Sequence, residues 1–159
     1  MKTQSTHSMT AKAIRNDLKK HFPAVSFSVR SSSFAGGNSV SIEWTNGPVY
    51  DEVNKVVSKY QYGDFDGMRD LYDMTNCRND IPQVKYVQVR REVSEDIKQT
   101  IFEECRKRYS GWEHLTSLDH CCAELMKQWS AWTARDYIYR ITCKIDLTNP
   151  SLKELLEAV

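Results

Sequence analysis

Asp64 and Asp66 are the residues whose type and spacing come nearest to those of a reactive site. The run Asp64-Phe65-Asp66-Gly67 has the Asp-x-Asp-Gly order of hydrolases that transfer phosphate. That chemistry holds the first aspartate, the nucleophile, at the end of an apolar strand beside a magnesium ion. Residues 59–63 read Lys-Tyr-Gln-Tyr-Gly, which we interpret as the tail of a helix. The apolar strand that this reaction needs before its nucleophile is therefore not expected here.

A calcium loop is the second chemistry that this acidic segment could offer. Such a loop needs oxygen ligands at regular steps and a closing glutamate, and Asp70 and Asp73 do not complete that pattern. We interpret the segment as a turn in which Gly67 takes a positive φ and Phe65 and Met68 fill the core. On this interpretation we expect no metal, no cofactor and no catalytic residue.

The cysteines and histidines suggest a third chemistry. Cys105, His114, His120, Cys121 and Cys122 could form a zinc set, but zinc ligands usually come as two pairs, each two to four residues apart. The two adjacent cysteines instead fall on the apolar side of a predicted helix, which favours packing. A cysteine nucleophile beside either histidine lacks a visible orienting partner. Five cysteines, an odd number, are not a disulfide framework, so a reducing, cytoplasmic location is expected.

Composition and charge exclude little else. The 159 residues are 40% hydrophobic and carry a net charge of +1, as expected for one globular domain with an appendage. No apolar run approaches the roughly 20 residues that cross a bilayer, and no leader pattern opens the chain. Residues 1–42 hold six basic and one acidic residue (+5), whereas residues 43–80 hold four basic and eight acidic ones (−4).

Alternating residues predict two strands early in the chain. Val25, Phe27 and Val29 alternate with polar residues, and after a glycine loop at residues 36–37 so do Val40, Ile42 and Trp44. Period-two alternation indicates one buried and one polar face, and the short loop predicts an antiparallel hairpin. Residues 84–91 predict a third strand, and residues 137–145 alternate well enough to predict a fourth.

Helical spacing and capping signals predict the remaining elements. We expect helices at residues 10–22, from Pro48 to about residue 60, from Ser94 to about residue 109, from Thr116 to about residue 132, and after Pro150. Residues 63–82 look like a long loop with a helical turn near residues 68–72. The expected order is α-β-β-α-β-α-α-β-α, an α+β fold whose antiparallel-rich sheet of three to four strands carries helices on one face. We expect a disordered tail at residues 1–9, a domain at 10–93, and a helical extension at 94–159 that packs on the same core.

The motifs along the first part of the chain resemble one family. Phe-Pro, Val-Ser-Phe-Ser-Val-Arg-Ser, the glycine loop, Ser-Ile-Glu-Trp-Thr-Asn-Gly-Pro, a helix and Asp-Phe-Asp-Gly-Met follow each other as in a small α+β domain, the large polyvalent protein-associated domain twenty-nine. The strand from Lys85 to Arg90 also resembles it, so the resemblance spans about residues 10–94. Family members occur in phage and plasmid genomes, often as modules of large proteins delivered with mobile DNA. The resemblance implies a mobile-element origin and a host-facing or defence-facing role, and it transfers no catalytic residue.

The sequence therefore favours a non-enzymatic protein that binds a macromolecule of the host or of a defence system. We expect this partner to be a protein. The expected binding surface is the polar strand face, formed by Ser28, Arg30, Ser41, Glu43 and Arg90. A tryptophan-rich part around Trp112, Trp129 and Trp132 is the second choice. The alternative is a nucleic-acid-binding accessory protein that uses a basic patch of Lys12, Arg15, Lys19, Lys20, Arg106, Lys107 and Arg108. We expect no membrane partner.

Overall fold

The computed structural model describes residues 5–120, 127, 131 and 133–148. The chain forms two compact units, the first from Met1–Trp44 with Tyr50–Arg91 and the second from Thr45–Val49 with Glu92–Val159. No described helix is both long enough and apolar enough to span a membrane.

A three-stranded sheet forms the base of the first unit. Strands β1 (Ser28–Phe34) and β2 (Gly37–Thr45) make the predicted antiparallel hairpin, with Val29 opposite Ile42. β1 begins three residues later than its alternation suggested. Strand β5 (Tyr86–Glu92), close to the predicted third strand, lies on the other side of β2. Contacts between β2 and β5 follow one another in the same order along both strands, from Asn38–Lys85 to Asn46–Glu92, so these two strands run parallel.

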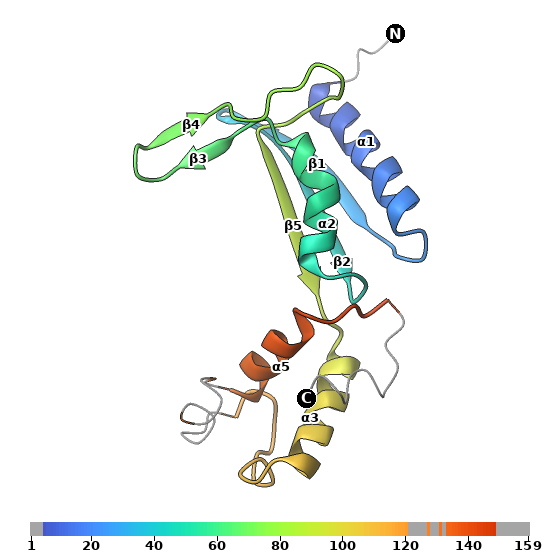
Figure 1. Cartoon of the computed structure of the whole chain (residues 1–159), viewed down its shortest axis with the longest axis vertical. Coiled ribbons are helices and arrows are strands. Elements are labelled where there is room, and N and C mark those ends of the chain that lie inside the picture. The colour runs from blue at the N-terminus through green and yellow to red at the C-terminus, as the bar shows by residue number, and fades with distance from the viewer. Residues whose placement is uncertain (1–4, 121–126, 128–130, 132, 149–159) are drawn as a thin grey trace. The chain divides into compact units, whose positions relative to one another are not determined.

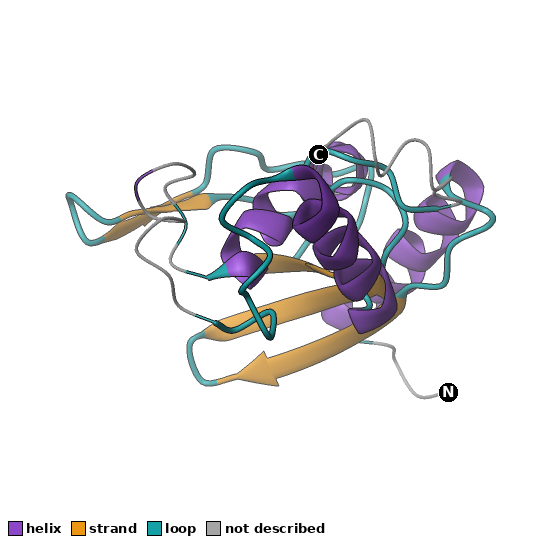
Figure 2. Cartoon of the chain, turned by 90° about the horizontal axis from the view of Figure 1, so that it is seen from below, coloured by secondary structure: helices purple, strands orange, loops and turns teal. Residues whose placement is uncertain are grey.

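Helices of the first unit cover one face of this sheet, as predicted, and no described helix of this unit covers the other, which we call the bare face (Figures 1 and 2). They are α1 (Thr6–His21), α2 (Tyr50–Val57) and the short 3-10 helix η1 (Ser58–Tyr60). Their apolar sides and the inward strand residues form one core: Ala11, Ile14, Leu18, Val29, Val40, Ile42, Trp44, Val53, Val57, Tyr60 and Val84. α1 begins at Thr6, not at Thr10, so the predicted tail extends too far; the Thr10 hydroxyl instead bonds the carbonyl of Thr6.

The expected loop at residues 63–82 contains a second, two-stranded sheet. β3 (Asp64–Asp66) and β4 (Leu71–Asp73) pair antiparallel and form a hairpin that extends to one side of the main sheet (Figure 1). The helical turn predicted near residues 68–72 is wrong. The antiparallel pairs β1–β2 and β3–β4 outnumber the parallel pair β2–β5, and the α+β class is confirmed.

The second unit is built on α3 (Glu95–Arg108) and α5 (Ala134–Thr142). Its core contains Ile101, Phe102, Cys105, Trp112, Leu115, Leu118, Ala134, Ile138 and Leu147. The predicted order holds up to α3 apart from the added hairpin, but the fourth strand is wrong, because residues 134–142 are helical. The predicted helix from Thr116 lies mostly outside the described residues, and the helix after Pro150 lies entirely outside them.

The helix α5 replaces the predicted strand for two local reasons. The Thr133 hydroxyl accepts the N–H of Asp136, and the Asp136 carboxylate accepts the N–H of Thr133, which completes a capping box. Ala134, Ile138 and Thr142 are buried at a spacing of four residues. Tyr139, which the strand interpretation would place with the buried residues, is 60% exposed. The helical period therefore decides which side chains enter the core.

Candidate interaction surface

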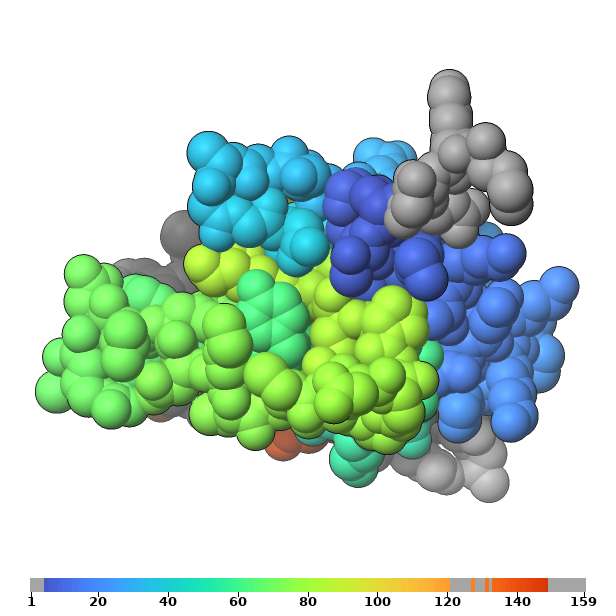
Figure 3. Space-filling view, turned by 90° about the horizontal axis from the view of Figure 1, so that it is seen from above, coloured from blue at the N-terminus to red at the C-terminus, as the bar shows by residue number. Residues whose placement is uncertain are grey.

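The β3–β4 hairpin exposes a concentration of apolar side chains. Phe65 is 56% exposed, Met68 95%, Leu71 51% and Met74 71%. We call these four residues the apolar hairpin surface. They lie on both faces of the hairpin and at its ends, because Phe65 pairs with Tyr72, Leu71 pairs with the neighbouring Asp66, Met68 lies in the turn and Met74 follows β4. Figure 3 shows the hairpin extending beyond the rest of the first unit. The prediction that Phe65 and Met68 fill the core is therefore wrong. Exposed apolar clusters on soluble domains usually mark contact sites for other macromolecules.

Charged side chains fix the turn of the hairpin. The Asp66 carboxylate accepts the backbone N–H of Met68 at 2.9 Å and the Nε of Arg69 at 2.6 Å. Arg69 also forms an ion pair with Asp73 on the opposite strand. Asp70, with φ of 51°, takes the left-handed conformation that the sequence assigned to Gly67. The Arg69 guanidinium, the largest influence, and the Met68 N–H lower the pKa of Asp66.

An aromatic cluster fixes the base of the hairpin to the sheet. The Tyr72 hydroxyl lies within hydrogen-bond distance of the carbonyl oxygens of Gly63 and Lys85, between which it shares its one proton. Its ring meets the rings of Tyr62 and Tyr86 edge to face at 5.7 and 5.6 Å, and the Lys85 Nζ lies 4.9 Å from its centroid. Burial, above all, raises the pKa of Tyr72 to about 12. The base is thus rigidly attached, while the apolar residues remain in solvent.

The bare face of the main sheet brings together the residues that the sequence selected for binding. Ser28 lies opposite Glu43 and Arg30 opposite Ser41, and the Ser41 hydroxyl donates to the Gln88 side chain at 3.1 Å. Arg90 lies two positions beyond Gln88, so it shares this face. The Arg30 side chain is exposed and forms no hydrogen bond or ion pair with another described residue. These five residues share one surface, and their role in binding stays a prediction.

A family comparison matches most of the elements just described. The model for the large polyvalent protein associated domain 29 matches residues 5–110, two thirds of the chain. This chain belongs to that family. The match contains the whole first unit from residue 5 onward, including the hairpin, and runs through α3. No curated protein and no solved structure matches the chain.

The basic patch of the alternative hypothesis divides between two places in this family member. Lys12, Arg15, Lys19 and Lys20 lie on α1 in the first unit, whereas Arg106, Lys107 and Arg108 lie on α3 in the second. Several of these cations have intramolecular partners: Arg15 donates to the carbonyl of Val29, Arg106 pairs with Glu103, and Lys107 pairs with Glu104. The seven residues therefore belong to two units that are described separately.

The cysteine, histidine and tryptophan candidates of this family member do not form a reactive site among the described residues. Cys105 is buried in the second core, and burial raises its pKa to about 12, so it remains an unreactive thiol near neutral pH. His114 is exposed, and among the described residues no three His, Cys, Asp or Glu side chains form a metal-binding group. Trp112 is 1% exposed, so it is a core residue and not the contact residue of the second choice. Trp129, Trp132, Cys121 and Cys122 lie outside the described residues.

Proposed function

We propose that this protein is a non-enzymatic accessory protein of a phage or plasmid, and that it binds a host or defence-system protein. The apolar hairpin surface is the observation that carries this proposal. Methionine and aromatic side chains are enriched in protein interfaces, and methionine adapts to irregular grooves. The family membership supports the mobile-element setting.

The rigid support of the hairpin strengthens the proposal. A flexible loop loses conformational freedom when it binds, and that loss weakens the complex. Here the Arg69 ion pairs and the Tyr72 hydrogen bonds already order the turn and the base. Met68 and its apolar neighbours therefore need little further ordering to enter an apolar groove. By occupying such a groove the protein would block the partner's own contacts, as a counter-defence inhibitor does.

The charge of the hairpin defines the partner further. Residues 64–73 contain Asp64, Asp66, Asp70 and Asp73 against Arg69 alone, a net charge of −3 from four acidic and one basic residue. A phosphate backbone would be repelled by this segment, whereas an apolar groove with basic residues at its rim complements it. A protein partner thus fits the hairpin better than a nucleic acid does.

Paired substitutions test this function. We expect the double variant Phe65→Ser, Met68→Ser to lose the partner that wild-type protein captures from host lysate treated with nuclease. Both side chains are exposed, so the variant should keep its fold. Interface anchors cost about 2 kcal/mol or more when truncated, which is roughly a thirtyfold loss of affinity. Met9→Ser, at an exposed methionine on α1, is the matched control and should capture as wild type does. Equal capture by both variants would contradict the proposal.

A further inference from the structure

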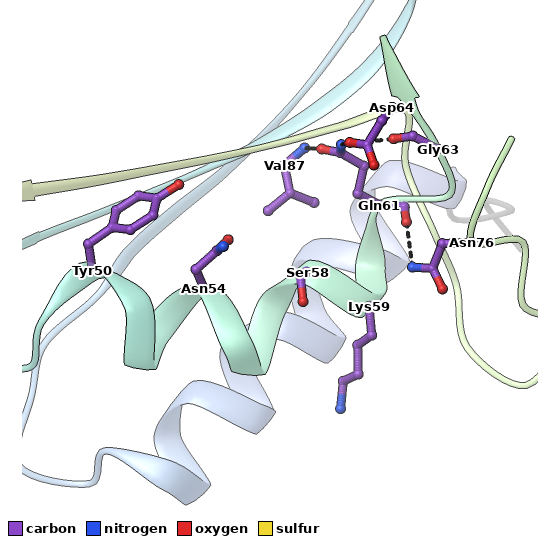
Figure 4. A pocket seen from close by; sticks show the side chains of 9 residues that line it. All are labelled: Tyr50, Asn54, Ser58, Lys59, Gln61, Gly63, Asp64, Asn76 and Val87. Atoms are coloured by element: carbon purple, nitrogen blue, oxygen red, sulfur yellow. Dashed lines mark hydrogen bonds between the residues drawn. The ribbon is translucent and has the colours of Figure 1, made fainter. Parts of the chain in front are cut away.

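An open cleft runs beside the outer edge of β5, the last strand of the sheet, in the first unit. It has a volume of about 540 Å³ and lies between α2 with η1 on one side and β5 with the start of the hairpin on the other (Figure 4). Its lining is mostly polar: Tyr50, Asn54, Ser58, Lys59, Gln61, Gly63, Asp64, Asn76 and Val87. The hydrogen bonds and charges of this lining show what it could hold.

The edge of β5 is only partly paired. The backbone of Val84 pairs with Tyr60 and Tyr62, and then the chain leaves the edge. Further along this edge, the side-chain oxygen of Gln61 accepts the N–H of Val87 at 2.8 Å. A side-chain amide thus takes the place that the backbone of a neighbouring strand would have. Because strand residues alternate in direction, Val89 presents its N–H and C=O to the same side. β5 ends the sheet there, and such an edge is a template for an added strand.

Asp64 gives the cleft its charge preference. Asp66 and Asp73 are paired with Arg69, and Asp80 with Arg78. Asp64 accepts only a neutral amide hydrogen, from Gln61 at 2.8 Å, and no described Lys or Arg forms an ion pair with it. Lys59 also lines the cleft, but its Nζ pairs with Asp17 at 2.6 Å, and Figure 4 shows its side chain directed away from Asp64. The uncompensated charge in the lining is negative.

We propose that this cleft receives an extended segment of the protein partner, which pairs with the edge of β5 at Val89 and places an arginine or lysine against Asp64. The inference rests on the proposed function and adds the chemistry of the bound segment. Main-chain hydrogen bonds supply affinity in strand addition, and side-chain pockets supply specificity. The small polar side chains of Asn54 and Ser58 leave room for a long cationic side chain to reach the carboxylate.

Titration of the full chain with defined peptides tests the inference. The probe is an acetylated, amidated heptapeptide of alternating threonine and valine with a central arginine. The matched control peptide, its match, has glutamate in place of that arginine. We expect the arginine peptide to shift the NMR amide signals of Val87 and Val89 and to bind more tightly than its match. Asp64→Lys should reverse that preference, whereas Asp70→Asn, at an exposed aspartate outside the cleft, should leave it unchanged.

The outcomes separate this inference from the proposed function. Absence of shifts at Val87 and Val89 with either peptide, or equal affinity for both peptides, would overturn the cleft assignment. Met68→Ser should leave peptide binding intact, because Met68 does not line the cleft. Partner capture that depends on the hairpin, together with a failed peptide titration, would retain the function and reject the cleft. Peptide binding without hairpin-dependent capture would reject the function instead.

Discussion

Phe65 and Tyr72 lie directly opposite each other in the β3–β4 hairpin, yet they meet different surroundings. Tyr72 is half-buried against Tyr62 and Tyr86, while Phe65 is 56% exposed. Opposite residues of an antiparallel pair share one face. One face of this hairpin therefore both attaches it to the sheet and presents an apolar ring to solvent, which is the arrangement of a fixed support with a free contact surface.

Removing the Tyr72 hydroxyl should loosen the hairpin. Tyr72→Phe keeps the ring contacts but deletes the hydrogen bonds to Gly63 and Lys85, whose net worth is about 1 kcal/mol. We expect faster amide hydrogen exchange in residues 64–73 and a small loss of unfolding free energy. Tyr139→Phe, at a tyrosine that is 60% exposed, is the control and should change neither. Unchanged exchange in Tyr72→Phe would show that the ring alone fixes the base.

The same tyrosine predicts a loss of stability at high pH. Its pKa is raised from 10.0 to about 12 in the folded chain, mainly by burial. Between these values the unfolded state releases its proton first, so the free energy of unfolding falls as pH rises from 10 to 12. Tyr72→Phe should reduce the slope in that window, measured by urea unfolding at several pH values. Equal slopes in the two proteins would contradict the raised pKa.

Arg69 should control the order of the hairpin turn. Asp64 lies opposite Asp73, a like-charged pair that destabilises a sheet unless a cation is near. Arg69→Ala removes that cation together with both ion pairs, so we expect the hairpin to open more readily, with faster amide hydrogen exchange in residues 64–73. Arg78→Ala makes the same change of charge at the Asp80 pair and is the control. Equal exchange rates in residues 64–73 of both variants would show that the Arg69 ion pairs do not order the turn.

Arg135 should stabilise the second unit. Its guanidinium binds Asp119 at 2.6 and 3.1 Å and both oxygens of Glu95 at 3.0 and 3.1 Å. These carboxylates raise the pKa of Arg135, with Asp119 the larger influence. Bidentate ion pairs of this kind stabilise the fold more than an isolated surface pair does. Arg135→Met should therefore lower the free energy of unfolding by about 1 kcal/mol. Lys107→Met, which loses a single ion pair, should cost less; a larger loss in that control would refute the assignment.

The sequence predicts the main sheet well because its central strand, β2, has one buried face. The alternation of Val40, Ile42 and Trp44 leaves one register that buries all three. It fails at residues 137–145, where tyrosines and isoleucines also alternate, because the capping box at Thr133 and the fourfold spacing of Ala134, Ile138 and Thr142 favour a helix. Alternation alone cannot show which residues meet a core.

The candidate site was only partly predictable. The polar sheet face around Arg30 follows from alternation, and the structure gathers its residues, although their binding role stays a prediction. Arg30→Glu tests it, since an exposed side chain can change without unfolding the domain. The sequence interpretation misses the hairpin because it assigns Phe65 and Met68 to the core by residue type. The signal that could have found it is the pair of short alternating runs, Asp-Phe-Asp and Leu-Tyr-Asp, on both sides of a four-residue turn.

Site-specific photo-crosslinking in host cells tests the central claim most directly. A benzophenone side chain at Met68 should form a covalent adduct with one protein, and the same group at Met9 should not form that adduct. The adduct should disappear when Phe65→Ser is combined with the probe at Met68. An identical adduct pattern from both probe positions, or adducts with nucleic acid at Met68, would contradict the account.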